Sequence, residues 1–406
     1  MSKYDGIHEK LSIVTDLGIE EWEFPTYSPS DVVAVFDLDF IVYSSACMTD
    51  NVTIEAHRNG KKKVFSGRKE FNDMLKDFNE RNPDKAMKKE DFEIVEVVKA
   101  QPISYALRSI KARVEGIMEQ LGANKCELYV GGSNNFRDKL PLPVPYKGNR
   151  KEVRRPTHLS ACKTYAVNVL GAKSVYGREA DDVVTQRAIQ IRKQGAEAIL
   201  IGEDKDAYGT YNIFTFNPKK DFEPFFIGEN PMSWSEGFLG EVYRVDGTRN
   251  YKGFGLRWKA FQICTFDAAD GYNFLDIARM NLMRKEGLTS KQASNRIKFD
   301  LVSLVDKLNG AESEKALWEV VVDHAKSYYG EEPVEYITHT GQVNSLDFLG
   351  ILNLYYHCVH MRLSINDDNT FYTVLRKQGL YDKPFDQSVE VCYLEDVGME
   401  VGVEKA

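Results

Sequence analysis

The chain has 406 residues, of which 43% are hydrophobic and 28% are charged, and this ordinary globular composition excludes wholesale disorder. Its 53 Lys and Arg residues against 61 Asp and Glu residues give a net charge of −8, which argues mildly against a protein that coats nucleic acid through bulk charge. Six scattered cysteines without a CxxC pair argue against a zinc site or a disulfide framework, and no apolar window is long enough to span a membrane, so we expect a cytoplasmic protein without a membrane partner.

The first part of the chain predicts a lead segment, a strand, a hairpin and a helix. Residues 1–30 are expected to be peripheral, and the continuous apolar run at 32–36 predicts a buried strand. Residues 52–65 predict a hairpin that turns at Asn59-Gly60. Apolar residues at helical spacing predict a long helix over 102–121.

The next part continues the alternation of strands and helices. The expected strands are 127–130, 173–176, 198–201 and 212–216, and the expected helices are 158–170 and 179–193. This order predicts an α/β fold with a mostly parallel central sheet flanked by helices. Residues 221–255 are expected to be an irregular insertion, 256–362 a C-terminal mainly helical region and 363–406 an irregular acidic tail.

Acidic residues follow two of the predicted strands at the point where each strand ends. Asp37 and Asp39 come directly after the first strand, and Asp204 and Asp206 follow the strand at 198–201. Ligands of an open α/β sheet bind outside the carboxyl ends of its strands. We therefore expect these two pairs to face one crevice.

Two more acidic clusters belong to predicted helix starts, and they are Glu179, Asp181 and Asp182, and Asp267 and Asp270. Helix capping is a sufficient explanation for any one cluster. Together, however, the clusters would repel one another unless cations compensate them. Hard oxygen ligands without His or Cys suit Mg²⁺ or Mn²⁺, and such sites can hold two ions about 4 Å apart that activate water for in-line attack on phosphate. The arrangement predicts phosphodiester chemistry.

Residues 137–155 are locally basic within this acidic chain. The segment has seven basic residues against two acids, interleaved with three prolines and Tyr146. A solvated charged surface is the alternative interpretation. Between acidic clusters, the segment favours a role in gripping phosphates, with Tyr146 stacking on a base.

These motifs together resemble the 5′-nuclease family, which includes flap endonucleases, the 5′-nuclease domain of bacterial DNA polymerase I and bacteriophage 5′→3′ exonucleases. The motifs are Phe36-Asp-Leu-Asp39, Tyr146-Lys-Gly-Asn-Arg150, Gly177-Arg-Glu-Ala-Asp-Asp182, Asp204-Lys-Asp206 and Asp267-Ala-Ala-Asp270-Gly-Tyr272, in the family's order over about residues 31–275. The resemblance implies a PIN-like nuclease core over 31–220 with a basic arch at 133–160. It also implies that 256–362 is a helical DNA-binding region.

The resemblance also implies roles for individual residues. Around one metal ion it places Asp37, Glu179, Asp181 and Asp182, and around a second it places Asp204, Asp206, Asp267 and Asp270. Lys147 and Arg150 would be catalytic, near the scissile phosphate. The substrate-binding residues would be Arg137 and Tyr146, to which the charge of the basic segment adds Lys151, Arg154 and Arg155.

The chain departs from the family pattern in two places. Many members have an Asp after the second strand, where this chain has Gly131-Gly132-Ser133, so one ligand is missing or supplied by water, with Asp39 as a candidate substitute. The family usually follows its last Asp pair with a glycine-rich helix–turn–helix that grips duplex DNA and K⁺. Residues 273–279 lack those glycines, which leaves the duplex-binding mode open.

The expected function is a Mg²⁺-dependent 5′→3′ exonuclease or flap endonuclease with two metal ions, Mn²⁺ being an alternative metal. Its expected substrate is DNA with a 5′ end, nick or flap, or RNA in an RNA–DNA hybrid, in phage DNA replication or degradation alongside replication proteins in the host cytoplasm. Three alternatives remain. They are a catalytically impaired DNA-binding relative, a haloacid-dehalogenase-type phosphatase, which the Asp-x-Asp after the first strand also matches, and an RNA-directed PIN-type nuclease.

Overall fold

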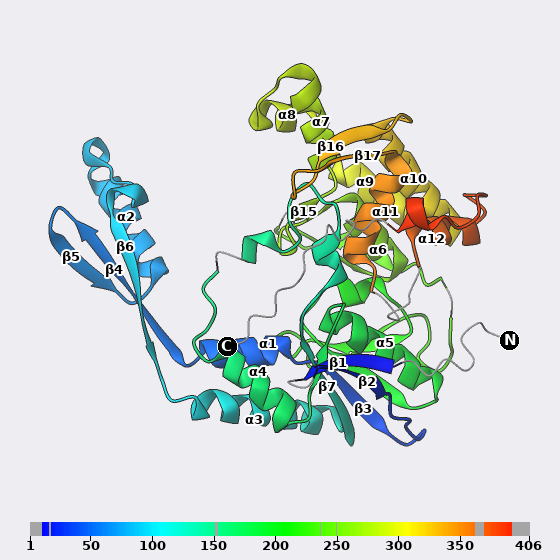
Figure 1. Cartoon of the computed structure of the whole chain (residues 1–406), viewed down its shortest axis with the longest axis horizontal. Coiled ribbons are helices and arrows are strands. Elements are labelled where there is room, and N and C mark those ends of the chain that lie inside the picture. Colours follow the sequence, from blue (N-terminus) through cyan, green and yellow to red (C-terminus); the bar gives the residue numbers. More distant parts are fainter. Residues whose placement is uncertain are drawn as a thin grey trace. The chain divides into compact units, whose positions relative to one another are not determined.

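The computed structural model describes residues 10–15, 18–150, 153–235, 237–248, 250–361 and 369–391, and of 10–22 it describes only the backbone. The chain folds into two compact units (Figure 1). The first unit comprises Met1–Asp37, Met118–Val153 and Lys173–Ala406, and the second comprises Leu38–Ile117 and Arg154–Ala172.

A mixed sheet forms the centre of the first unit. In the described residues its order is β11-β10-β9-β3-β7-β8-β1-β2. Five neighbouring strands run parallel, and they are β10 (Ile213–Phe216), β9 (Glu197–Ile201), β3 (Val32–Asp37), β7 (Lys125–Gly131) and β8 (Lys173–Val175). Antiparallel strands flank them, and these are β11 (Phe225–Ile227), β1 (Lys10–Thr15) and β2 (Gly18–Glu23). The predicted mostly parallel α/β sheet is confirmed, and residues expected in the lead segment add β1 and β2 to it.

Helix α5 (Ala180–Lys193) covers one face of this sheet. Its Val183 and Ile191 are fully buried in one apolar cluster with Val33 and Val35 of β3. Burying such a side chain stabilises a fold by about 1.5–3 kcal/mol. This packing fixes where α5 begins relative to the carboxyl ends of the parallel strands.

The C-terminal part of the first unit is mainly helical and has its own core, which includes Trp318, Tyr355 and Phe371. Its helices are α6 (Gly255–Cys264), α7 (Asp276–Glu286), α8 (Ser290–Arg296), α9 (Leu301–Gly310), α10 (Glu314–Tyr329) and α11 (Phe348–Val359). Hairpins β12 (Glu241–Arg244) with β13 (Tyr251–Phe254), β14 (Phe266–Asp267) with β15 (Tyr272–Asn273), and β16 (Val334–Ile337) with β17 (Val343–Leu346) interleave with them. The predicted C-terminal helical region is confirmed.

Two segments expected to be irregular contain regular structure. Strands β11, β12 and β13 lie within residues 221–255. The described part of the tail, residues 369–391, forms α12 (Phe371–Lys377) and α13 (Gln387–Glu390). The tail packs because Phe371 and Leu375 are buried, and because the side chain of Asn353 accepts a hydrogen bond from the Phe371 amide at 2.9 Å.

The second unit contains a three-stranded antiparallel sheet with a helix on one face (Figure 1). The predicted hairpin is confirmed as β4 (Asp50–Arg58) and β5 (Lys61–Phe65), and Asn59 and Gly60 have φ values of 51° and 73° at its turn. Strand β6 (Glu93–Ala100) pairs with β4, and α2 (Arg68–Arg81) buries Phe71 and Leu75 against the sheet.

The remaining helices complete the description. Helices α1 (Asp39–Cys47) and α4 (Leu159–Asn168) belong to the second unit, and α3 (Ser104–Leu121) begins there. Short 3₁₀ helices are η1 (Pro83–Lys85), η2 (Lys89–Asp91), η3 (Phe136–Lys139), η4 (Gly148–Arg150) and η5 (Asp206–Gly209). Within the described ranges, no helix has both the length and the apolar character needed to cross a membrane.

Candidate metal centre

The carboxyl ends of β3 and β9 bring two of the predicted acidic motifs to the same edge of the sheet. The strands pair in parallel, with Phe36 opposite Ile201. Asp37 therefore ends β3 beside the segment that leads to Asp204, and a Cβ built on Gly202 would lie 3.9 Å from the Asp37 Cβ. The parallel pairing of β3 with β9 thus explains why Asp37 lies near the segment that carries Asp204 and Asp206.

Three buried carboxylates form the tightest acidic group. Asp206, Asp267 and Asp270 each offer one oxygen, and these oxygens all lie within 4.8 Å of one another. The side chains are at most 4% exposed. Three hard oxygen donors at this spacing can bind a metal ion, and they suit Mg²⁺ or Mn²⁺ better than a metal that prefers nitrogen or sulfur.

Asp267 and Asp270 lie on a tight hairpin between α6 and α7, and the prediction that they begin a helix is wrong. Asp267 ends β14, and its Oδ1 accepts a hydrogen bond from the Ala269 amide at 2.8 Å. Gly271 has φ 77°, a left-handed conformation that favours glycine, and its amide bonds the Asp267 carbonyl at 2.8 Å. The turn holds the two carboxylates on the same side of the loop.

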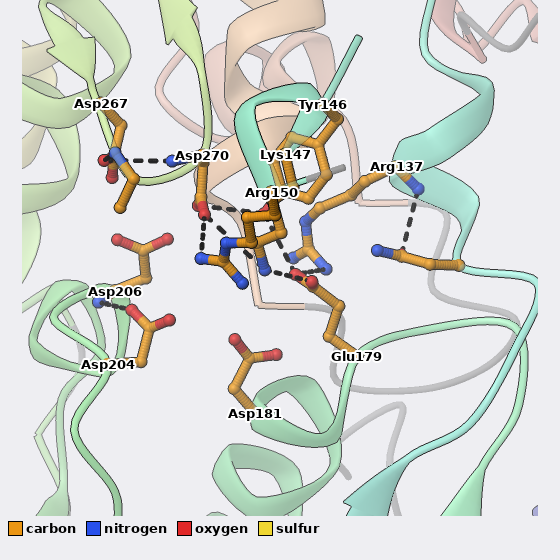
Figure 2. A network of polar contacts seen from close by, with 12 residues as sticks. Arg137, Tyr146, Lys147, Arg150, Glu179, Asp181, Asp204, Asp206, Asp267 and Asp270 are labelled. Carbon is orange, nitrogen blue, oxygen red and sulfur yellow. Dashed lines mark hydrogen bonds and ion pairs between the residues drawn. The ribbon is translucent and has the colours of Figure 1, made fainter. Parts of the chain in front are cut away.

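The segment after β9 supplies Asp204 and Asp206. The Asp206 amide donates to Asp204 Oδ1 at 2.8 Å, so the first aspartate caps the turn that positions the second. Figure 2 shows both carboxylates on the side of the centre opposite Glu179, with the Asp267 and Asp270 hairpin facing them.

The three acids at the start of α5 differ in where their side chains lie (Figure 2). Glu179 is the N-cap residue, and its amide donates to Asp182 Oδ2 at 3.1 Å. Asp182 is fully buried and turned toward Arg137. Glu179 and Asp181 instead point into the centre, toward Asp270 and Asp204 (Figure 2).

Burial and mutual repulsion raise the pKa values of several of these carboxyl groups. Burial and the nearby Asp204 and Asp270 raise the pKa of Asp206 well above its ordinary value, and burial with Glu179 does the same for Asp181. Burial raises the pKa of Asp270 to about 6, although Lys147 opposes the shift. The charged carboxylates are therefore disfavoured without a cation among them, as expected of a divalent metal site.

Basic side chains from the predicted phosphate-gripping segment lie within the same centre. Lys147 pairs with Glu179 and has its Nζ 3.7 Å from Asp270 Oδ1, and Arg150 Nη2 is 3.3 Å from the same oxygen. Although burial opposes it, Glu179 holds the pKa of Lys147 above its ordinary value. Lys205, which the sequence did not single out, pairs with Asp267 at 2.8 Å.

Tyr146 is buried in the core, with 5% of its surface exposed. Its hydroxyl, which has one hydrogen to donate, lies 3.0 Å from Asp270 Oδ2 and 3.1 Å from Glu179 Oε2. The ring has no open face for a base, so the structure does not support the expected stacking role. The side chain instead joins two acidic clusters that are far apart in the sequence.

Arg137 is buried as well, with 1% of its surface exposed. Its Nη1 and Nη2 bond the two oxygens of Asp182 at 2.7 and 2.8 Å, Nη1 lies 3.1 Å from Glu179, and Nη2 donates to the His360 carbonyl at 2.9 Å. A guanidinium engaged in this way is not accessible to a nucleic acid strand in this conformation. The expected substrate-binding residue is placed as a support for the start of α5.

The other predicted residues belong to the second unit or lie outside the described residues. Arg154 belongs to the second unit, where it pairs with Asp50 at 2.6 Å, and Asp39 pairs there with Lys163 at 2.9 Å. Arg155 belongs to the same unit and is exposed, and Lys151 lies outside the described residues.

Gly132 occupies the position where the resembling family usually has an aspartate. A Cβ at this residue would lie 2.2 Å from the Val175 carbonyl oxygen, because the Gly132 amide bonds that oxygen at 2.9 Å. With this backbone no side chain fits at position 132. The hydrogen bond from Gly132 to Val175, which extends the pairing of β7 with β8, therefore leaves no room for the aspartate that the resembling family usually has here.

Comparison with known proteins adds little to this geometry. No protein-family model matches the sequence, and no curated protein matches it. Among solved structures, the chain is similar to the T5 D15 protein, co-crystallized with metal ions, at a TM-score of 0.30 and 12% identity, covering 81% of this chain and 98% of that chain. A likeness of this size does not identify a family.

Proposed function

We propose that the protein is a divalent-metal-dependent nuclease that hydrolyses phosphodiester bonds in DNA, as a 5′→3′ exonuclease or flap endonuclease. One observation carries the proposal. The buried oxygens of Asp206, Asp267 and Asp270 lie within 4.8 Å of one another, in a centre that also contains Lys147 and Arg150. Carboxylates that bind cations, next to basic side chains that attract phosphate, form the chemical environment that a phosphodiesterase requires.

Two cation positions follow from the donor set. Asp206, Asp267 and Asp270, with Asp204 beside them, would hold one Mg²⁺ or Mn²⁺, and Glu179, Asp181 and Asp37 would hold the second. Such ions, when bound, polarise phosphate oxygens and lower the pKa of water. Asp182 has both oxygens engaged by Arg137, and so we assign it to positioning Glu179.

The basic residues have different parts in this proposal. Arg150 has a side chain that is 55% exposed, so its guanidinium can turn from Asp270 to a phosphate of the substrate. Lys147 is mostly buried beside Glu179 and Asp270, where it orients the carboxylates and stabilises charge that develops on the scissile phosphate. Arg155 and Lys151 would extend the phosphate contacts.

The substrate is proposed from the sequence motifs. They resemble those of 5′-nucleases, which supports DNA with a 5′ end, a nick or a flap, and an RNA strand in an RNA–DNA hybrid as a second substrate. Replication or degradation of phage DNA, in contact with replication proteins, is the setting that fits this activity.

The decisive experiment compares cleavage of labelled flap, nicked and blunt duplexes with Mg²⁺ and with EDTA. We expect Asp204→Asn with Asp206→Asn to abolish cleavage and to preserve DNA binding. Asp73→Asn with Asp77→Asn, on the exposed face of α2, is the matched control and should cleave like the wild type. Cleavage that persists in the first variant would refute the metal assignment.

Two other results would identify an alternative function. DNA binding without cleavage of any substrate by the wild type would indicate a catalytically impaired relative. Hydrolysis of a small aryl phosphate without cleavage of DNA would indicate a phosphatase.

A further inference from the structure

Helix α6 contacts the acidic turn after β9 through two side-chain hydrogen bonds. The indole Nε1 of Trp258 donates to the Lys205 carbonyl at 3.0 Å, and the amide Nε2 of Gln262 donates to Asp206 Oδ1. A Cβ on Gly209 would lie 3.3 Å from the Lys259 Cβ, so η5 and α6 approach closely. This helix belongs to the core of the C-terminal helical region, which therefore contacts the candidate metal centre directly.

The contact between Gln262 and Asp206 has one favourable orientation when Asp206 is charged, as it is when it binds a cation. A carboxylate that binds a cation is charged and has no hydrogen to donate, so toward Asp206 in this form the glutamine presents its NH₂ group and turns its carbonyl oxygen away. Oδ1 of Asp206 is then engaged, while Oδ2 accepts no hydrogen bond from the described residues. A carboxylate restrained on one oxygen and free on the other is prepared to bind a cation.

Gln262 is a buried polar residue on a face of α6 that is otherwise mainly apolar. Gln262 is 3% exposed, and its Oε1 is buried without a hydrogen-bond partner among the described residues. A buried polar atom without a partner lowers stability. The same face of α6 buries Trp258 and Phe261, so the surroundings would accommodate an apolar side chain. The polar side chain thus points to a role toward Asp206.

We propose that Gln262 is a positioning residue that sets the affinity of the metal centre for divalent cations through Asp206. This inference rests on the proposed function, because it requires Asp206 to be a cation ligand. Partners that orient metal ligands from outside the first coordination sphere typically change metal affinity by 10–100-fold when they are removed. Gln262 is therefore expected to act on cation binding and not on DNA contact.

The test is Gln262→Met, which keeps the length of the side chain and removes the amide donor. Mn²⁺ binding is measured by isothermal titration calorimetry in the absence of DNA, on the full chain. We expect Mn²⁺ to bind about tenfold or more weakly, and the Mg²⁺ concentration for half-maximal cleavage to rise, with KM for DNA unchanged. The melting temperature in EDTA should equal or exceed that of the wild type.

The control is Gln186→Met in α5, a glutamine that is 2% exposed and whose side-chain amide has no partner among the described residues. It should bind Mn²⁺ like the wild type. A double variant adds specificity: because Gln262 acts through Asp206, Gln262→Met should have no further effect on Mn²⁺ affinity in an Asp206→Asn background. If Gln262→Met does not fold, Gln262→Leu serves for the same measurements.

Failure of this inference is distinguishable from failure of the proposed function. Wild-type Mn²⁺ affinity in Gln262→Met, with DNA cleavage by the wild type, overturns the positioning role alone. Weaker Mn²⁺ binding in the variant, without cleavage of DNA by the wild type, supports the positioning role and overturns the nuclease. Absence of Mn²⁺ binding in the wild type overturns both.

Discussion

Replacing Arg137 with methionine tests whether this arginine supports the start of α5. The variant removes a guanidinium that is 1% exposed and breaks the ion pair that it makes with the fully buried carboxylate of Asp182. Removing one partner of a buried ion pair typically costs about 3–5 kcal/mol, because the remaining charge is left uncompensated. We expect a loss of this size in the free energy of unfolding.

Urea unfolding followed by tryptophan fluorescence is the appropriate assay. The four tryptophans are residues 22, 234, 258 and 318, and all belong to the first unit, so the signal reports the unfolding of the unit that contains Arg137. The matched control is Arg284→Met, since Arg284 pairs with Glu335 and both side chains are more than half exposed. An exposed pair contributes at most about 1 kcal/mol.

A double variant isolates the interaction. Arg137→Met with Asp182→Asn removes both charges, and the asparagine side-chain oxygen can still accept the hydrogen bond that the Glu179 amide donates to Asp182 at 3.1 Å. We expect more than half of the lost stability to return. If Arg137→Met costs no more than Arg284→Met, Arg137 does not stabilise α5 by pairing with Asp182, and the reasoning is refuted.

Three further predictions concern other parts of the first unit. Glu127 is buried and accepts hydrogen bonds from Arg187 at 2.6 and 2.8 Å. Burial alone would raise the pKa of Glu127, but Arg187 holds it below its ordinary value of 4.5. The stabilisation that the Glu127–Arg187 pair gives is therefore complete above that value and is lost as pH falls through the lower pKa of the folded protein. Glu127→Gln should thus have a lower free energy of unfolding than the wild type at pH 7 and should lose less of it as the pH falls. Parallel pH profiles of the two proteins would contradict this. Gly132→Ala should lower the free energy of unfolding by about 2 kcal/mol or more, because the new Cβ meets the Val175 carbonyl oxygen. The control is Gly310→Ala, which has open space around it and should not lower the free energy of unfolding. Equal urea midpoints for the two variants would show that the backbone at Gly132 moves to accommodate the Cβ. Asp267→Asn should abolish the rise in melting temperature that Mn²⁺ gives the wild type, because it removes one of the three carboxylates that would hold the ion. A Mn²⁺-dependent rise that remains in the variant would remove Asp267 from the site.

Much of the first unit's fold could be predicted because its strands are buried on both faces. A run such as Val33 to Phe36, fully buried, is continuous in the sequence and needs no partner to be identified. The three-stranded sheet of the second unit was predicted only in its hairpin, because Asn59-Gly60 is a local signal whereas β6 pairs with β4 from more than 30 residues away. Helix α2 was not predicted, although its apolar residues Phe71, Met74, Leu75 and Phe78 stand at helical spacing, so here a usable local signal was missed.

The candidate site, like the fold, could be predicted from the sequence only in part. The acids after β3 and β9 could be located because strand direction fixes where a parallel strand ends. The turn at Asp267 and Asp270 could not, because acidic residues followed by a mainly helical segment also match a helix start, and Gly271 alone marks the difference. Gln262 carried no signal, since a glutamine five residues before an aspartate on a predicted helix is ordinary surface composition.

The basic segment shows why charge sign does not specify the partner of a side chain. Its net positive charge suggested contact with phosphates, yet Arg137 and Lys147 are used within the protein to hold Asp182 and Glu179. A group of buried carboxylates must be partly neutralised for the chain to fold before any cation binds, and side chains nearby in space are the available source. Divalent cations at Asp270 and Glu179 would compete with Lys147 for the same oxygens. Occupation of the site would then release Lys147 from these carboxylates, so under the proposed function the side chain that stabilises the cation-free protein would become available to a phosphate.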